Sequence, residues 1–186
     1  MDSTQLNKIL KCLRYKERFS EWHTLNEQCL KQVSTRPGIY VIRKHSGQFG
    51  RLRGKSDILY IGSTETTGGL RTRLRRYLYP SRHSTTDNRV HQFLKRYEMD
   101  IAWCAFEKPH QSHKLKSYKP RNAEYRLLQL YVEQHYELPP LNHSTMYFLE
   151  DGHGTGDDTF YVDAELWHKL KLPKRFKKKE GKRTRA

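Results

Sequence analysis

The sequence predicts a protein of α/β (α+β) class, with one domain and short extensions. Its 186 residues match the roughly 100–200 residues of a single domain. Apolar residues at helical spacing alternate with three short runs rich in β-branched and aromatic residues, which predict strands. Aromatic residues form 12% of the chain, enough for a folded core even though hydrophobic residues reach only 35%.

The N-terminal part predicts helix followed by a hairpin. Residues 4–33 have apolar residues at helical spacing, and Pro37 interrupts the pattern. Residues 38–43 and 57–62 predict two strands, and the glycine-bearing link between them predicts a hairpin. This link is long for a hairpin, so it is either a decoration or a functional loop.

The rest of the core predicts three helices and one strand. Residues 70–79 carry apolar side chains on one helical face, and Pro80 ends the helix. Further predicted elements are a short helix at 89–97, a strand at 101–106, a helix from Asn122 to about His135, and an extended segment at 138–142.

These elements predict four regions along the chain. Residues 1–35 form an N-terminal helical extension, residues 36–145 the core, and residues 146–173 a C-terminal extension packed on the core. Residues 174–186 contain eight basic side chains and one acidic one, which predicts a flexible basic tail.

Charge and composition limit the functional classes. The formal net charge of +16 is typical of a protein with a polyanionic partner, nucleic acid first and an anionic membrane surface second. The sequence has no run of about 18 apolar residues and no signal-peptide pattern, so we expect neither membrane insertion nor secretion. The three scattered cysteines (Cys12, Cys29 and Cys104) fit a reducing compartment, so the expected location is the cytoplasm.

Several motifs in the predicted core occur together and in order. They are Gly38-Ile39-Tyr40, Tyr60-Ile61-Gly62, Leu70-x-x-Arg73-Leu74-x-x-Tyr77, Ala123-Glu124 and Leu138-Pro139-Pro140-Leu141-Asn142. This arrangement resembles the GIY-YIG nuclease family over roughly residues 36–143. The resemblance implies a three-stranded antiparallel sheet flanked by helices. The chain departs from the family in its longer hairpin link, residues 41–59, and in the longer stretch from Gly62 to Arg73.

The residue types fit phosphodiester hydrolysis on chemical grounds. A hairpin can present Tyr40 and Tyr60 side by side, and a nearby cation favours the ionised form of a phenol. Arg73 suits a phosphate because its planar fork donates two hydrogen bonds and stays charged. Tyr77 lies one helical turn from Arg73. Glu124 is a carboxylate that can hold Mg²⁺, which often takes only one or two protein carboxylates.

The resemblance assigns a role to each of these positions. Tyr40 or Tyr60, or the water it contacts, activates the nucleophile, with Tyr40 slightly favoured. Arg73 neutralises the phosphate, Tyr77 occupies the place where the family has His or Tyr, and Asn142 braces the site. Glu124 binds a single Mg²⁺ or Mn²⁺ ion. Three neighbouring arginines compete for the arginine role, but helical register favours Arg73, which follows Leu70 by three positions and precedes Tyr77 by four.

We therefore expect a metal-dependent DNA endonuclease, sequence-specific and restriction-like, that is nucleoid-associated when bound to DNA and acts as a homodimer on duplex DNA. The alternatives are a structure-specific repair or recombination nuclease and a non-catalytic, RNA-binding module. The expected DNA-binding residues are Arg71, Arg75, Arg76, Lys174, Arg175, Lys177, Lys178 and Lys179.

Overall fold

A computed structural model describes residues 3–12, 16–81, 84–106 and 120–142. The chain divides into two compact units, Met1–His143 and Ser144–Ala186, and every described residue belongs to the first. The extension predicted at 146–173 and the basic tail predicted at 174–186 lie outside the described residues.

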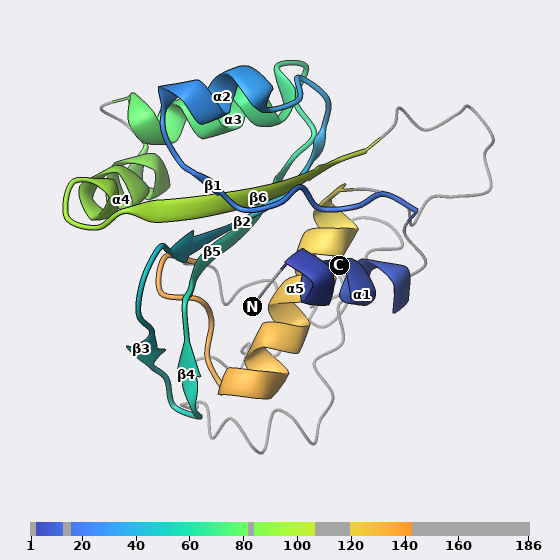
Figure 1. Ribbon diagram of the computed structural model, residues 1–186, viewed down its shortest axis with the longest axis vertical. Helices are drawn as coiled ribbons and strands as arrows, with labels where there is room; N and C mark the ends of the chain where they lie inside the picture. Colours follow the sequence, from blue (N-terminus) through green and yellow to red (C-terminus); the bar gives the residue numbers. More distant parts are fainter. Residues whose placement is uncertain (1–2, 13–15, 82–83, 107–119, 143–186) are drawn as a thin grey trace, which may run out of the picture. The chain divides into compact units, whose positions relative to one another are not determined.

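The first unit is built on an antiparallel sheet with the strand order β1-β6-β2-β5 (Figure 1). Its long strands are β2 (Gly38–Lys44), β5 (Ile58–Thr64) and β6 (Met99–Ala105), within two residues of the predicted strands. β2 lies between the other two and pairs antiparallel with both. The predicted α+β class is confirmed, but β1 (His23–Thr24) adds a fourth strand beside β6.

The N-terminal helical pattern is interrupted where β1 forms. Helix α1 spans Ser3–Cys12 and helix α2 spans Glu27–Gln32. Between them the backbone hydrogen-bonds to β6, since the amide of Leu25 donates to the carbonyl of Met99 at 2.8 Å. Apolar spacing alone could not separate this two-residue strand from the adjacent helix, because its partner is more than seventy residues away.

The long link between β2 and β5 forms a second, two-stranded ladder. Strand β3 (Phe49–Gly50) pairs with β4 (Lys55–Ser56) across a turn in which Gly54 has φ +73°. The turn is held against the C-terminal end of helix α5 (Pro120–His135). There the amide of Leu52 donates to Glu137 Oε1 at 2.7 Å, and the amide of Arg53 donates to the carbonyl of His135 at 3.2 Å.

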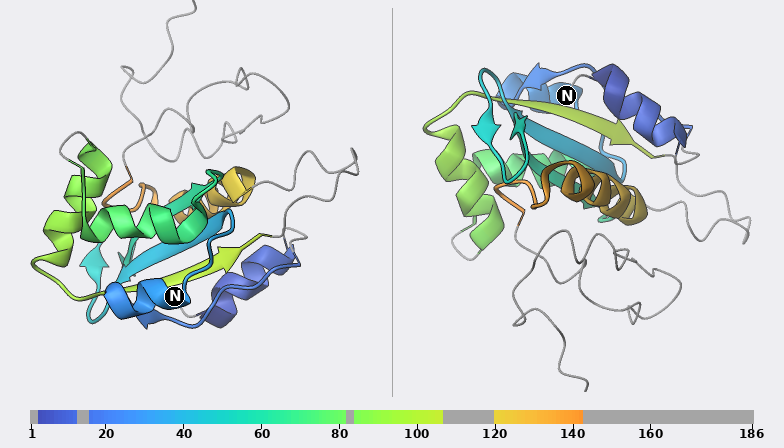
Figure 2. Two further views of the ribbon diagram at one scale, coloured as in Figure 1. Left: turned by 90° about the horizontal axis from the view of Figure 1, so that it is seen from above. Right: turned by 90° about the horizontal axis from the view of Figure 1, so that it is seen from below.

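Helices cover both faces of the sheet. Helices α2 and α3 (Gly69–Leu78) lie on one side, while α1 and α5 lie on the other (Figure 1). Helix α4 (Thr85–Leu94) packs beside α3, and the right-hand view of Figure 2 places α1 and α5 in front of the sheet. Because β5 is the last strand in the order, its outer edge pairs with no further strand among the described residues and lies between the two helical layers.

The contact between α3 and β2 depends on Gly38, the first residue of the GIY motif. A Cβ at this position would collide with the carbonyl oxygen of Cys104 and with the side chain of Leu70. Leu70 and Leu74 are fully buried on the face of α3 that packs on the sheet. This close approach brings the next turn of α3, which carries Arg73, over the two tyrosines of the hairpin, Tyr40 and Tyr60.

Candidate active site

Three tyrosine rings meet under α3. Tyr40 comes from β2, Tyr60 from β5 and Tyr77 from α3, and their ring centroids are 6.0–6.1 Å apart. The hydroxyl oxygens of Tyr40 and Tyr77 are hydrogen-bonded at 2.5 Å. Tyr40 and Tyr77 are fully buried, whereas Tyr60 is 9% exposed to solvent.

Strand register explains why the YIG motif ends in glycine. Tyr40 lies directly opposite Gly62 in the β2–β5 ladder. A Cβ on Gly62 would lie 2.6 Å from the Tyr40 hydroxyl and 2.5 Å from a ring carbon of Tyr60. The missing side chain therefore leaves the space that the two phenols occupy.

Arg73 joins the tyrosines from α3. Its Nε donates to the Tyr40 hydroxyl at 3.2 Å, and its guanidinium carbon lies 5.2 Å from the centroid of the Tyr77 ring. Its Nη1 donates to Asp87 Oδ1 at 3.0 Å. The Arg73 side chain is 22% exposed, so it remains open to a ligand while its cation stays partly desolvated.

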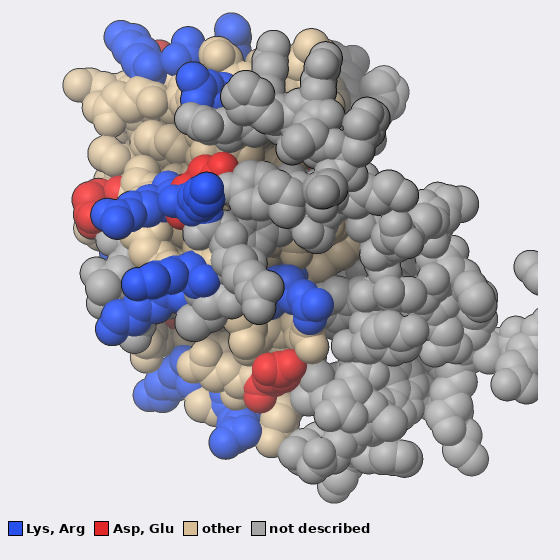
Figure 3. Space-filling model, turned by 90° about the vertical axis from the view of Figure 1, so that its right-hand side faces the viewer, with Lys and Arg blue, Asp and Glu red and all other residues tan. Residues whose placement is uncertain are grey.

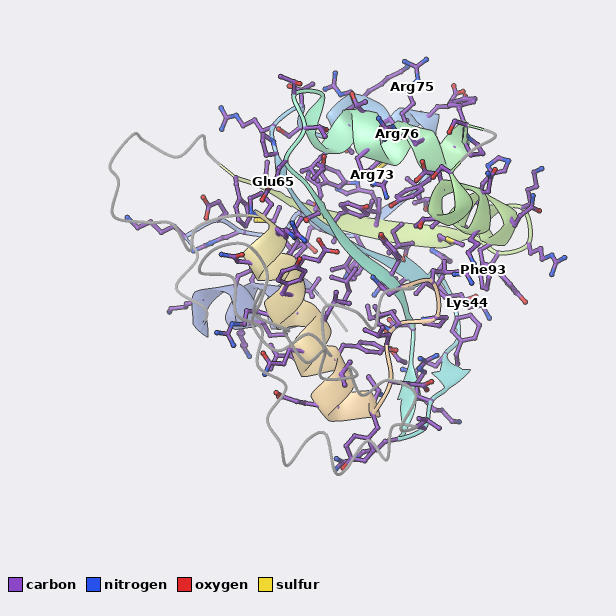
Figure 4. The ribbon with its side chains drawn as sticks, turned by 180° about the vertical axis from the view of Figure 1, so that it is seen from behind. Lys44, Glu65, Arg73, Arg75, Arg76 and Phe93 are labelled. Atoms are coloured by element: carbon purple, nitrogen blue, oxygen red, sulfur yellow. The ribbon has the colours of Figure 1, made fainter. Side chains whose placement is uncertain are left out.

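The neighbouring arginines of α3 lie elsewhere. Arg71 donates to the main-chain carbonyls of Val33 and Lys31, at the end of α2 and just after it. Arg75 and Arg76 are exposed on α3, as Figure 4 shows beside Arg73. Among the arginines of α3, the structure thus brings Arg73 to the tyrosines, in agreement with the helical register.

Burial controls the protonation of the tyrosines. Desolvation raises the pKa of Tyr40, and the charge of Arg73 lowers it only in part. The pKa values of Tyr60 and Tyr77 are also raised, again chiefly by burial. For Arg73, burial acts to lower the pKa, but the neighbouring Tyr40 and Tyr77 groups outweigh it and the pKa is raised. Near neutral pH the site thus combines protonated phenols with a fixed cation.

Glu124 reaches the edge of β5 from the opposite helical layer. It lies in the second turn of α5, and its Oε2 accepts a hydrogen bond from the Ser63 hydroxyl. Desolvation raises its pKa, while hydrogen bonding to Ser63 and the charges of Arg121 and Arg73 lower it. The charge of Arg73, on the other side of the edge strand, is thus one of the influences that lower the pKa of Glu124.

The donor set fits one hard divalent ion held by one carboxylate. Glu124 supplies hard oxygen ligands, and burial, which raises its pKa, disfavours the charged carboxylate that a cation would stabilise. Within the described ranges, no group of three or more His, Cys, Asp or Glu side chains forms a metal cluster. A Mg²⁺ or Mn²⁺ ion at Glu124 would therefore depend on water and substrate oxygens for its remaining ligands.

Asn142 closes the outer edge of β5. Its side-chain amide donates to the carbonyl of Ile61 at 2.7 Å, and its Oδ1 accepts from the amide of Ile61 at 3.0 Å. The amide of Leu141 donates to the carbonyl of Leu59 at 2.9 Å. The segment after the two prolines thus supplies the hydrogen bonds that a further strand would supply, which holds the YIG motif in place.

Two residues of this arrangement were not predicted from the sequence. Ser63 lies next to the YIG glycine, and only the strand register shows that it points toward α5. Asp87 lies three residues after Ser84, whose hydroxyl accepts from the Asp87 amide at 3.2 Å. This spacing resembles a helix-capping signal and gives no indication of an arginine partner.

Basic side chains are spread over the described surface. On the face shown in Figure 3 they form separate groups with few acidic neighbours. The predicted tail contacts at Lys174, Arg175, Lys177, Lys178 and Lys179 lie outside the described residues. None of the described helices is long and apolar enough to cross a membrane.

Comparisons with known proteins found no match among family models, curated proteins or solved structures. Function is therefore inferred from the sequence motifs and from the geometry of the tyrosines, Arg73 and Glu124.

Proposed function

We propose that this protein is a metal-dependent endonuclease that hydrolyses phosphodiester bonds in DNA, with a site of the GIY-YIG type. One observation carries the proposal. The side chains of Tyr40, Tyr60, Arg73 and Tyr77 lie together on one side of β5, and Glu124 lies on the other side of the same strand. These residues come from segments far apart in the sequence, and they combine a cation, a carboxylate and phenol groups at one strand edge.

Arg73 is the group suited to the phosphate. Its guanidinium stays charged at any physiological pH, and 22% of its side chain is exposed to an incoming ligand. Hydrogen bonds to Tyr40 and Asp87 fix the direction of the fork before substrate binds. A preorganised donor of this kind stabilises the charge that develops on the phosphate oxygens in the transition state.

Tyr40 and Tyr60 are the two candidates for contact with the attacking water. Both phenols are protonated near neutral pH, since a free phenol has a pKa of about 10 and burial raises the pKa of each further. Tyr40 also accepts the Arg73 hydrogen bond, whereas Tyr60 keeps the larger exposed fraction. Comparing Tyr40→Phe with Tyr60→Phe separates the two, since the first removes the hydroxyl that accepts from Arg73 Nε and donates to or accepts from Tyr77, and the second removes the more exposed hydroxyl.

Glu124 would hold a single Mg²⁺ or Mn²⁺ ion. When bound, such an ion stabilises negative charge on the phosphate and on the leaving oxygen. Ser63 fixes the carboxylate by donating to Oε2, so that Glu124 keeps its direction without the ion. Asn142 keeps β5, which carries Ser63 and Tyr60, in position through the Ile61 backbone.

DNA is the proposed substrate because the net charge of +16 favours a polyanion. We propose sequence-specific, restriction-like cleavage by a homodimer on duplex DNA. Arg71, Arg75 and Arg76 are the basic residues of α3 proposed to contact the DNA backbone next to the site.

Plasmid digestion tests the proposal. The native protein and Glu124→Gln are incubated with supercoiled plasmid and Mg²⁺, with EDTA as a second control. Discrete bands from the native protein alone support a specific endonuclease. Nicking limited to branched DNA would replace sequence specificity with structure specificity. Absence of cleavage on duplex, single-stranded and branched DNA, with Mg²⁺ or Mn²⁺, would overturn the proposal.

A further inference from the structure

We propose that Asp87 is a positioning residue that fixes the Arg73 guanidinium for the phosphate. This inference rests on the function proposed above and extends it to a residue on a third helix. Asp87 lies in the first turn of α4, and its Oδ1 accepts from Arg73 Nη1 at 3.0 Å. Its side chain is 2% exposed, so this carboxylate is removed from solvent.

The geometry fixes the plane of the guanidinium from two sides. Tyr40 accepts from Nε at 3.2 Å and Asp87 accepts from Nη1 at 3.0 Å. Because the guanidinium is planar, two bonds at different nitrogens leave little freedom to rotate. The third nitrogen, Nη2, is used by neither bond, and its direction is set by the other two.

A role in helix capping does not explain the burial of this carboxylate. The capping contact of α4 uses the Ser84 hydroxyl and the main-chain amide of Asp87, which any residue at this position supplies. A buried carboxylate needs a charged partner, because desolvation of an unpaired anion is costly. Among the described contacts, the one charged partner of Asp87 is Arg73. The side chain of Asp87 thus acts on Arg73, and its backbone acts on α4.

The pair also limits the net charge of the site. The Arg73 cation neutralises the Asp87 anion before substrate binds, so Asp87 reduces the local positive potential and works against binding. A residue that served only to increase affinity for DNA would be neutral or basic. Its expected contribution is therefore to the rate of the chemical step rather than to DNA affinity.

Single-turnover cleavage separates these effects. We expect Asp87→Asn, which keeps the shape and removes the charge, to lower the cleavage rate on the order of 10- to 100-fold, as for other residues that orient a reacting group. The dissociation constant for DNA, measured without metal, should not rise, because the variant removes a negative charge next to the site. Ser84→Ala is the matched control, because it removes the cap of α4 and keeps the carboxylate. It should cleave within about twofold of the native rate.

A measurement independent of activity completes the test. The Nη1–H signal of Arg73 in ¹⁵N-edited NMR, assigned by its loss in Arg73→Lys, should be protected from exchange in the native protein and in Ser84→Ala. It should lose protection in Asp87→Asn. If the native protein cleaves no DNA while this pattern holds, the proposed function fails and the positioning of Arg73 stands.

Two results would overturn the inference: an unchanged Arg73 signal in Asp87→Asn, or a native cleavage rate in that variant. If Asp87→Asn does not fold, Asp87→Glu keeps the charge and moves the carboxylate by one methylene. A native rate and an unchanged Arg73 signal in Asp87→Glu would equally contradict a positioning role.

Discussion

In the described part of the chain, Arg43 and Arg73 each pair with a buried aspartate, and they differ in what else surrounds them. Arg43 donates through Nε and Nη2 to Asp100 Oδ2, at 3.1 and 3.0 Å, and its Nη1 lies 3.8 Å from Asp57. Its guanidinium carbon also lies 4.2 Å from the centroid of the Trp22 ring. Arg73 has one carboxylate partner, Asp87, and its other neighbours are phenols.

The two arginines are almost equally exposed, at 23% for Arg43 and 22% for Arg73, so their partners are what distinguish them. Around Arg43, two carboxylates and the His45 ring, which lies 2.8 Å from Asp100, fix the charge within the fold. Around Arg73, one carboxylate and neutral hydroxyl groups orient the cation. We therefore expect Arg43 to support stability and Arg73 to support catalysis.

The largest expected effect concerns the carboxylate that faces Arg73 across β5. Glu124→Gln should lower the cleavage rate by about 10³-fold or more, because loss of the bound ion raises the free energy of the transition state by several kcal/mol. DNA affinity without metal should stay within about twofold. Glu133→Gln, the same change at an exposed position of α5, is the control and should cleave normally. An unchanged rate in Glu124→Gln would remove Glu124 from the site.

Removal of the phosphate cation comes next. Arg73→Ala should lower the single-turnover rate by about 10²–10³-fold, as loss of one preorganised donor typically does. Arg71→Ala removes hydrogen bonds to the Val33 and Lys31 carbonyls and should cost about 1 kcal/mol of stability with little loss of rate. A rate loss in Arg71→Ala greater than that in Arg73→Ala would mean that the wrong arginine has been assigned.

The Arg43 cluster should respond in the opposite way. Asp100→Asn leaves Arg43 without its main charge partner, and the Asp100 side chain is only 6% exposed. We expect the free energy of unfolding to fall by roughly 2–4 kcal/mol, as when one member of a buried pair is removed. Urea unfolding measures this loss, and cleavage at 25 °C should stay within about threefold. A large rate loss in a folded Asp100→Asn protein would break the distinction between the two clusters.

The smallest expected effect is a pH dependence at His45. Hydrogen bonding to Asp100 raises the pKa of this exposed imidazole, so the protonated ring stabilises the folded state. The stabilisation is fully present below the unfolded pKa, about 6.5, and is lost as the pH rises through the raised folded value. The Tm difference between native protein and His45→Gln should therefore shrink between pH 5.5 and pH 8.5. A difference that grows with pH would contradict this coupling.

The fold was largely predictable because its elements have local signals. The strands around Tyr40 and Tyr60 are β-branched and aromatic runs, and α3 has apolar residues at helical spacing before Pro80. Strand β1 was missed because it depends on pairing with β6, which is distant in the sequence. Helix α5 begins at Pro120, two residues before the predicted start, since proline is tolerated in a first helical turn.

The candidate site was predictable where its residues belong to the sequence motifs. Tyr40, Tyr60, Arg73 and Tyr77 lie together as their spacing indicates. Ser63 and Asp87 had no signal of their own, because each acts through a side chain supplied by another helix. The expectation that a nearby cation would favour the ionised phenol underestimated burial, which outweighs the charge of Arg73 at Tyr40.

The most direct test of the account measures rate and stability together in Arg73→Ala and Arg43→Ala. We expect Arg73→Ala to lose about 10²–10³-fold in single-turnover cleavage at a temperature where it stays folded, and to lose some Tm because buried Asp87 loses its charged partner. We expect Arg43→Ala to keep the cleavage rate and to lose Tm. Equal loss of cleavage rate in both folded variants, or the reverse pattern, would contradict the assignment of Arg73 to the phosphate.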